Sequence, residues 1–464
     1  MLIEDRFEIA RRMLSGEQQH NSFLIRDFNK MRDRELVDSA KLSEIIKQSE
    51  KRNPKIALFN EFLGSNVLEQ VINVKAFPKY KKPLIAISSD KIINKKFTVT
   101  QKLWFGYAGD VSPAQGEEVQ IALDKSKNAL VKGVLFLEDA KKRHLIFAID
   151  FIEGWMTGYI AMYCNEADRD YASKIMQIII EDAKTNNFFR GAKINPQGKF
   201  IRPDNITMDD IILKDEIKKR ITSGTVDMIN NVETYKKNNV PIKRGILMEG
   251  APGTGKTLVA KALCNQVKST FIWVTADDVT YPDDITNIYD MARELSPTIV
   301  LFEDIDYIGK NRQSDKDANR SGSYDKITGE LLNQMDGVDS NEGIITLASS
   351  NYPKALDKAL RNRPGRFDIR VRFELPDAEL RKKMVEKFFS KNNIEDLDVE
   401  KIVKLTDGYS GAYIKELAIA TIMLALEDHS VGEDGNAVIK STYFDEAFSQ
   451  IEQSRKLDDI QDEE

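Results

Sequence analysis

A chain of 464 residues is long enough for about three domains. Its composition, 41% hydrophobic and 31% charged residues, is typical of a soluble globular protein and excludes a disordered or membrane-embedded chain. The formal net charge of −6 argues against general nucleic-acid binding, although a local basic groove stays compatible with it.

Cysteine usage points to a reducing environment. Cys164 and Cys264 lie far apart, and neither belongs to a spacing typical of a disulfide framework or a metal site. Cys264 falls in a predicted helix and is interpreted as a small buried residue. We therefore expect a cytoplasmic protein.

No segment is predicted to cross a membrane. Charged residues at positions 4–6 interrupt the apolar character of the N-terminus, so no signal-peptide pattern is present. The apolar run 145–164 approaches the length of a membrane span, but it contains Asp150 and Glu153, which are costly inside a bilayer. Because Gly154 separates two β-rich halves, we predict a hairpin buried in a globular domain.

The first part of the chain is predicted to hold two regions. Residues 1–62 are predicted to form a helical arm, because apolar residues such as Ile3 and Phe7 recur at helical spacing. Residues 63–200 are predicted to form a small β-containing N-domain, with a helix over 166–184. This N-domain is a candidate surface for a protein substrate or partner. Its β-rich runs are residues 67–74, 83–87, 97–99 and 119–123.

Two basic clusters lie in the N-domain, at residues 79–82 and 141–143. We interpret them as solvated turns rather than nucleic-acid contacts, because short charge runs between strands usually face water. Residues 192–208 contain two prolines and are predicted to be a linker.

The C-terminal half is predicted to be α/β. From 204 to 375, short apolar strands alternate with helices, which is typical of a parallel sheet covered on both faces. Residues 376–455 are predicted to form a small helical lid, and residues 456–464 an acidic, disordered tail. The predicted strands are Ile246–Met248, Phe271–Val274, Ile299–Phe302, Ile344–Leu347 and Ile369–Phe373.

A phosphate-binding loop follows the first of these strands. Residues 250–257 satisfy the pattern G-x-x-x-x-G-K-[ST], with a predicted strand before it and a predicted helix after it. Glycines let backbone N–H groups approach phosphate oxygens, and the helix start adds free donors. We expect Lys256 to reach the β- and γ-phosphates and the Thr257 hydroxyl to bind Mg²⁺. The predicted nucleotide-binding residues are Gly250, Ala251, Pro252, Gly253, Thr254, Gly255, Lys256, Thr257 and Leu258.

Two acids end another apolar strand. Glu303 and Asp304 directly follow the run 299–302. ATP hydrolysis needs one carboxylate to hold hydrated Mg²⁺ and another to polarise the attacking water. The register favours Glu303 for the metal and Asp304 for the water.

Further candidate residues follow in chain order. Asn351 ends a strand and could hydrogen-bond the γ-phosphate or the attacking water. Arg363 and Arg366 lie where a neighbouring subunit would present a guanidinium to a γ-phosphate, a task for which arginine is suited by its permanent charge and bidentate geometry. Gly411 and Ala412 open a helix suited to closing the lid over the nucleotide.

These motifs together resemble the AAA ATPase module of the AAA+ superfamily, over about residues 204–455. The resemblance implies a large α/β and a small helical subdomain, ATP with Mg²⁺, a hexameric ring and work on a macromolecule. Most members carry Asp before Glu, so which of Glu303 and Asp304 activates water stays open. The order Glu-Asp is similar to the branch that contains the mitochondrial Rieske-protein translocase. The motifs are residues 250–257, 302–306, 331–337, 351, 363–368 and 408–412.

One segment departs from the family pattern. Protein-threading members place an aromatic, a hydrophobic residue and a glycine in a pore loop after the second strand, but residues 275–284 are short and lack the glycine. Tyr281 is the aromatic candidate there; it could grip an extended polypeptide or pack beneath Pro282. No H-E-x-x-H zinc-protease motif occurs in the sequence, so any proteolysis would need a partner.

We therefore predict an oligomeric Mg²⁺-dependent ATPase that remodels, unfolds or translocates protein. Two other classes stay open. One is a DNA-associated motor or loader, which DNA would stimulate in a salt-sensitive way. The other is a scaffold that assembles with ATP but does not turn it over.

Overall fold

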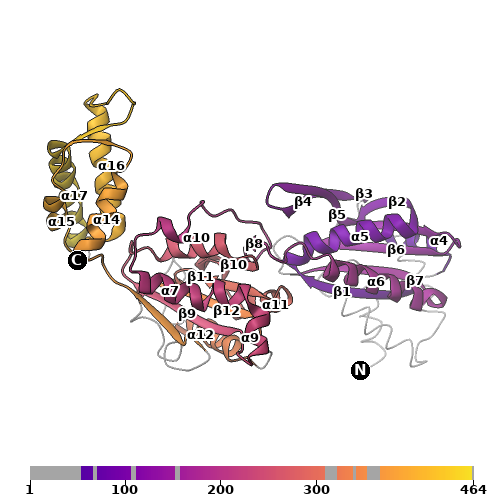
Figure 1. The fold of residues 1–464 in the computed structure, drawn as a ribbon. Helices are drawn as coiled ribbons and strands as arrows, with labels where there is room; N and C mark the ends of the chain where they lie inside the picture. The colour runs from indigo at the N-terminus through magenta and orange to yellow at the C-terminus, as the bar shows by residue number, and fades with distance from the viewer. Residues whose placement is uncertain are drawn as a thin grey trace. The chain divides into compact units, whose positions relative to one another are not determined.

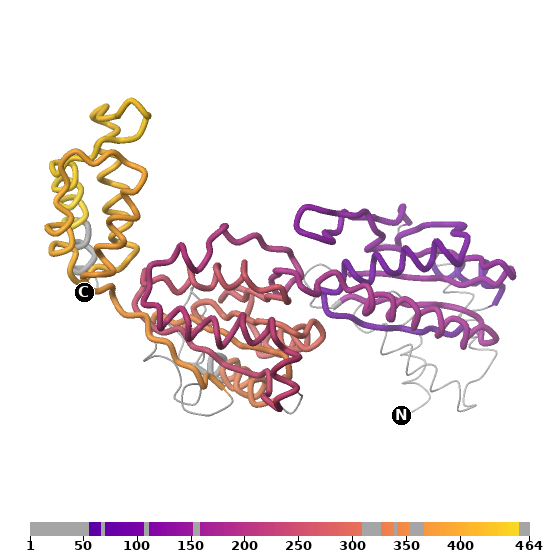
Figure 2. The backbone as a smooth tube through the Cα atoms, viewed as in Figure 1, coloured from indigo at the N-terminus to yellow at the C-terminus, as the bar shows by residue number. Residues whose placement is uncertain are grey.

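The computed structural model describes residues 54–65, 70–105, 111–151, 157–308, 321–337, 341–352 and 366–461. The chain divides into two compact units. The first comprises residues 1–189 and 197–200, and the second comprises residues 190–196 and everything from residue 201 onward. Figures 1 and 2 trace the backbone of both units.

The first unit, the N-domain, is built on an antiparallel sheet whose strand order is β1-β7-β6-β5-β2-β3, with β4 paired to β5. Helices α5 and α6 pack together and contact the sheet (Figure 1), while α4 packs on β6. The strands are β1 (Gln70–Pro78), β2 (Phe97–Phe105), β3 (Val111–Pro113), β4 (Gln115–Ala122), β5 (Lys125–Asp139), β6 (His144–Phe151) and β7 (Thr157–Asn165). The helices are α4 (Pro54–Leu63), α5 (Lys82–Lys96) and α6 (Arg169–Thr185).

The predicted antiparallel pairing within residues 145–164 is confirmed, and residues 152–156 between the two strands lie outside the described residues. Strands β6 and β7 pair antiparallel, with Ile146 opposite Tyr163. Along β6 the side chains alternate: Ile146 and Ala148 join a core with Phe59 of α4, and the residues between them face the other side. In the part of the chain that the structure describes, no helix is long and apolar enough to span a bilayer.

Residues 83–87 were predicted as a strand, and this is wrong, because they lie in α5. The helix has a proline in its first turn and buries Leu84 and Ile85, and later Ile92 and Ile93, at helical spacing. A short apolar run fits a buried strand or a buried helix equally well, so periodicity alone could not separate them. The predicted helix over 166–184 is confirmed as α6. Of the predicted helical arm, residues 1–53 lie outside the described residues.

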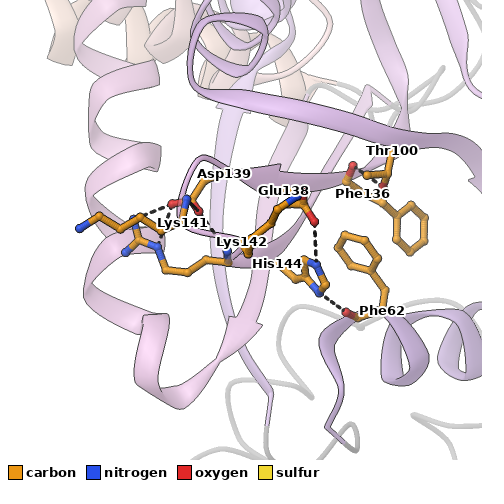
Figure 3. Close-up of polar contacts among 9 residues, drawn as sticks. Phe62, Thr100, Phe136, Glu138, Asp139, Lys141, Lys142 and His144 are labelled. Atoms are coloured by element: carbon orange, nitrogen blue, oxygen red, sulfur yellow. Dashed lines mark hydrogen bonds and ion pairs between the residues drawn. The ribbon is translucent and has the colours of Figure 1, made fainter.

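The basic turn 141–143 is neutralised by local contacts (Figure 3). Asp139 accepts hydrogen bonds from the backbone N–H groups of Lys141 and Arg143, at 2.8 and 3.0 Å. Arg143 also pairs with the Asp139 carboxylate at 2.6 Å, and Lys142 pairs with Glu138 at 2.6 Å. The Lys142 and Arg143 side chains therefore have carboxylate partners inside the N-domain, which supports the interpretation as a turn.

The second unit contains a parallel sheet of strand order β13-β9-β12-β11-β10-β8. The five predicted strands are confirmed, and the predicted α/β fold class is correct. The strands are β8 (Lys193–Ile194), β9 (Lys243–Gly250), β10 (Thr270–Val274), β11 (Thr298–Phe302), β12 (Ile344–Ser350) and β13 (Ile369–Phe373).

Strand β8 comes from the stretch 192–208 that was predicted to be a linker. It pairs with β10 at the sheet edge, and the Lys193 ammonium donates to the carbonyls of Val267 and Ser269 at 2.6 and 2.8 Å. A strand of two residues leaves no periodic signal in sequence. The second unit therefore includes residues ahead of position 204.

Helices cover both faces of the parallel sheet. One face packs on α7, α8 and α10 in a single apolar core that includes Ile246, Leu263 and Leu301. On the other face, Tyr289 of α11 stacks on Phe302, and its hydroxyl lies 2.9 Å from that of Thr346. The helices are α7 (Asp215–Gly224), α8 (Val226–Asn230), α9 (Val232–Lys237), α10 (Lys256–Gln266), α11 (Pro282–Glu294) and α12 (Ser321–Asp336).

The lid that follows has its own core, in which α14, α16 and α17 bury Met384, Leu417 and Phe444. It is not wholly helical as predicted, because β14 and β15 form a small parallel pair. Helix α17 continues to Gln461, into the stretch 456–464 that was predicted to be disordered. The elements are α14 (Ala378–Phe388), β14 (Asn393–Asp396), α15 (Val399–Leu405), α16 (Gly411–Glu427), β15 (Val438–Lys440) and α17 (Ser441–Gln461).

Candidate functional site

The glycine-rich loop lies between β9 and α10, as the sequence predicted. Gly253 and Gly255 have φ angles of 74° and 103°, a left-handed backbone region that a side chain disfavours. This conformation turns successive N–H groups toward one side and, with the start of α10, forms a concave anion-binding backbone. The observed backbone therefore fits a nucleotide phosphate group.

Lys256 is buried and is held by the loop itself. Its ammonium donates to the carbonyl oxygens of Gly250 and Ala251, both at 2.8 Å. Burial lowers the pKa of Lys256, while the nearby charges of Asp304 and Asp306 oppose that shift. A phosphate arriving in the loop would offer this ammonium a full negative charge in place of two carbonyl dipoles.

Glu303 reaches the phosphate loop directly. The Thr257 hydroxyl donates to Glu303 Oε1 at 2.8 Å, and the Trp273 indole N–H donates to Oε2 at 2.9 Å. One hydroxyl and one carboxylate side by side are the hard oxygen ligands that Mg²⁺ accepts, with the remaining positions filled by phosphate and water. Among the described residues, no group of three or more His, Cys, Asp or Glu side chains could hold a metal by itself.

Asp304 lies in a different environment, next to Asn351. Its backbone is left-handed, with φ of 48°, and its N–H donates to the Ser349 hydroxyl at 2.9 Å. The Asn351 amide donates to Asp304 Oδ1 at 3.0 Å. Burial raises the pKa of the Asp304 carboxyl, and the negative charges of Glu303 and Asp306 raise it further.

A third acid, Asp306, was not predicted as a site residue. Its side chain is buried, and its Oδ1 accepts the backbone N–H of Asn351 at 3.2 Å, whereas Oδ2 has no hydrogen-bond partner among the described residues. It therefore fixes the backbone of Asn351 relative to the acidic strand. The sequence signal was its place two residues after Asp304.

A cavity of about 540 Å³ lies at the loop and combines the predicted residues with others. Predicted residues that line it are Pro252, Gly253, Thr254, Gly255, Lys256, Thr257, Leu258, Asp304, Asn351, Gly411 and Ala412. Gly250 and Ala251 do not line it but bind Lys256 through their carbonyls. The Ala412 N–H donates to the Gly253 carbonyl at 3.1 Å, so the first turn of α16 contacts the phosphate loop.

The apolar part of the lining of this cavity was missed in the sequence. It is lined by Ile206, Ile211 and Ile212 ahead of the phosphate loop and by Met384 and Phe388 of α14. Lys387 of α14 joins the two groups, because its ammonium donates to the Asp210 carbonyl at 2.7 Å. The apolar triplet 211–213 was the available signal. A planar apolar base fits such a lining.

The two candidate arginines do not behave alike. Arg363 lies outside the described residues. The Arg366 guanidinium is buried and forms a bidentate pair with Asp336, at 3.0 and 2.7 Å. The Arg366 backbone packs on β9, because a Cβ on Gly245 would lie 1.9 Å from the Arg366 carbonyl oxygen. Its predicted role at the γ-phosphate of a neighbouring subunit stays a prediction.

The segment between β10 and α11 is a pair of capped turns. The Asp278 and Asp284 carboxylates accept the backbone N–H groups of Thr275 and Tyr281, both at 2.8 Å. Two of the four acids in this segment therefore serve as caps, and Asp277 and Asp283 are exposed. The Tyr281 side chain is 66% exposed, which contradicts packing beneath Pro282.

Comparisons with known proteins agree with this geometry. Residues 246–375 match the family model described as "ATPase family associated with various cellular activities (AAA)". The chain is 31% identical over 281 residues to a protein of Methanothermobacter thermautotrophicus named as a 26S proteasome regulatory subunit homolog, covering 58% of this chain and 71% of the relative.

Two further relatives are larger than the matched region. An ATPase family protein 2 homolog of Caenorhabditis elegans is 30% identical over 290 residues, covering 58% of this chain and 39% of the relative. The ATP-dependent zinc metalloprotease FtsH of Caldicellulosiruptor bescii is 33% identical over 231 residues, covering 47% of this chain and 36% of the relative. The chain thus spans well under half the length of these two proteins.

Proposed function

Since the chain belongs to the AAA family of ATPases, we propose that it hydrolyses ATP with Mg²⁺ in the cavity at the phosphate loop and uses the energy to remodel, unfold or translocate protein. The observation that carries this proposal is the division of labour between two adjacent acids. Glu303 is bound to the Thr257 hydroxyl, whereas Asp304 is bound to the Asn351 amide.

The roles of the individual residues follow from these contacts. Thr257 and Glu303 would hold Mg²⁺, which neutralises charge on the phosphates. Asp304 would accept the proton of the attacking water, and its raised pKa makes it a stronger base than an ordinary aspartate. Asn351 would hold the water or the γ-phosphate beside it, and Lys256 would exchange its carbonyl partners for phosphate oxygens.

The base of the nucleotide would lie against the apolar lining formed by Ile206, Ile211, Ile212, Met384 and Phe388. Because this lining joins the lid to the α/β subdomain, binding would draw the two together. Gly411 and Ala412 would stay in contact with the phosphate loop through the hydrogen bond from the Ala412 N–H to the Gly253 carbonyl.

A ring of identical subunits, of hexameric size by family resemblance, is part of the proposal. In it Arg363 would reach the γ-phosphate of the neighbouring subunit. Arg366 would instead anchor the segment after 361–365 through its pair with Asp336. The N-domain would contact the protein client. A reducing compartment such as the cytoplasm fits Cys164 and Cys264, which are both free and buried.

Protein is the favoured client for two reasons. The relatives named above include a proteasome regulatory subunit homolog and a protease. The exposed Asp277 and Asp283 would also repel a nucleic-acid backbone. The acid order Glu-Asp remains a four-residue resemblance to the Rieske-translocase branch, and the relatives named above do not belong to that branch by name.

The test is phosphate release by the purified full chain with Mg²⁺ and with chelator, using Lys256→Ala as the variant that loses nucleotide. Strong stimulation by DNA that disappears with salt would favour a DNA-associated motor. Assembly on ATP without phosphate release would favour a scaffold. Client identity would come from proteins that co-purify with Asp304→Asn held in the ATP-bound state.

A further inference from the structure

Glu303 is held at both carboxylate oxygens, and the second partner is a tryptophan. Oε1 accepts from Thr257 and Oε2 accepts from Trp273 Nε1, at 2.8 and 2.9 Å. The phosphate-loop motif accounts for the first contact, but neither the motifs nor the family description account for the second.

The indole is fixed in place by its own surroundings. Trp273 lies on β10 beside β11, with its Cα opposite that of Leu301, and the Glu303 N–H donates to the Val274 carbonyl at 2.8 Å. Its ring packs against the apolar core that contains Phe271, with ring centroids 6.0 Å apart. An indole has one N–H donor, and here that donor is directed at Glu303.

A glutamate at this position needs such a partner more than an aspartate would. Glutamate has an additional rotatable bond, and ordering a long side chain costs conformational entropy. An indole ring that is already packed loses little conformational freedom when its N–H donates a hydrogen bond. Because the acceptor is a carboxylate, that hydrogen bond is also among the stronger kinds.

From this arrangement we infer that Trp273 is a positioning residue for Glu303: its indole N–H holds Oε2 so that Oε1 remains on the Thr257 hydroxyl, where Mg²⁺ would bind. The inference rests on the proposed function for its meaning in catalysis, but the contact itself needs no ligand. It gives a physical reason why a glutamate can occupy this position, since the indole compensates for the longer side chain.

The contact can be tested in the full chain without nucleotide. In ¹H–¹⁵N spectra, the indole resonance that disappears in Trp273→Phe identifies the donor. That resonance should move when Glu303→Gln removes the negative acceptor, whereas the resonance of Trp104, which lies in the N-domain, should stay. An unmoved Trp273 resonance would overturn the inference.

The positioning role is tested by the dependence on Mg²⁺. Trp273→Phe keeps an aromatic ring and removes the donor. It should raise the Mg²⁺ concentration needed for half-maximal phosphate release about tenfold, as expected for loss of one hydrogen bond to a charged group, with ATP affinity in chelator unchanged. Trp104→Phe is the matched control and should change neither quantity.

Glu303→Asp is the second variant, since it keeps Trp273 but retracts the carboxylate from the indole. It should also raise the Mg²⁺ requirement, and adding Trp273→Phe to it should cause no further change. Additive effects, or a normal Mg²⁺ requirement in folded Trp273→Phe, would contradict positioning. If the parent chain released no phosphate, the proposed function would fail, while the spectra would still decide the contact.

Discussion

The two units of this chain use their sheets in different ways. In the second unit all strands are parallel, so their carboxyl ends meet at one edge, and residues from β9, β11 and β12 converge there. In the N-domain neighbouring strands run in opposite directions, and Asp139 in the turn before β6 is bound by Arg143 only four residues away. Parallel topology therefore brings residues from three strands together at one edge of the sheet.

The largest effect is expected from a substitution in the candidate site at the phosphate loop. Asp304→Asn should keep nucleotide binding, because Lys256, Thr257 and Glu303 remain, but it should lower turnover about 10²–10⁴-fold by removing the proposed base. Nucleotide binding and phosphate release, measured side by side, check this. Normal turnover in Asp304→Asn with loss in Glu303→Gln would mean that the two acids exchange roles.

A smaller loss is expected at the subunit boundary. Arg363→Ala should reduce phosphate release roughly 10- to 150-fold, the range for one charge-assisted hydrogen bond of about 1.5–3 kcal/mol. Mixing it with Lys256→Ala subunits should restore some activity, since certain interfaces then pair an intact loop with an intact arginine. Full activity of a demonstrably monomeric preparation would exclude a shared site.

Arg366→Ala should act on stability instead. Its guanidinium is buried against Asp336, so we expect the free energy of unfolding to fall by about 1–3 kcal/mol, with mixing giving no rescue. Urea unfolding of the two arginine variants compares them directly. An unchanged free energy of unfolding together with a loss of phosphate release would indicate that Arg366 acts in ATP hydrolysis.

The boundary between the two units gives a fourth test. A fragment of residues 190–464 retains β8, whereas a fragment of residues 204–464 loses it together with the hydrogen bonds of Lys193. We expect the shorter fragment to unfold at a lower urea concentration, with a free energy of unfolding that is smaller by about 1–3 kcal/mol. Equal midpoints would show that β8 contributes nothing to the sheet.

The pH dependence sharpens the role of Asp304. The proposed base role needs the ionised form of Asp304, and burial with nearby acids raises its pKa. As pH falls, kcat/KM should therefore decline at a higher pH than for an ordinary aspartate, since this ratio reports groups of the free enzyme. Circular dichroism over the same pH range controls for unfolding. An acid limb at or below the usual aspartate range would contradict a raised pKa.

The smallest effect on turnover is expected at Tyr281. Its exposed ring lies outside the cavity, so Tyr281→Ala should leave phosphate release unchanged. If the ring grips a client, remodelling of that client should stop. The client must first be found with Asp304→Asn. Unchanged remodelling would leave the N-domain as the better candidate for the working surface.

The sequence by itself determined the phosphate loop, the acidic strand end and the five main strands, because each is a local pattern. The phosphate loop is recognised from glycines at fixed spacing, and the acidic strand end from a continuous apolar run followed by acids. Each of these patterns is contained in a short stretch of the sequence. The same locality explains the error at 83–87, where a short apolar run fits either secondary structure.

Tertiary structure alone decided which partners those residues meet. Strand β8 joins the sheet by pairing with β10, and the Arg366 guanidinium is buried in a pair with Asp336. The apolar cavity lining, which includes Ile211 and Phe388, also joins residues far apart in the chain. The hydrogen bond from Trp273 to Glu303 does the same. Such contacts arise from packing between elements, which leaves no periodic signal in sequence, and this is why only the folded chain reveals them.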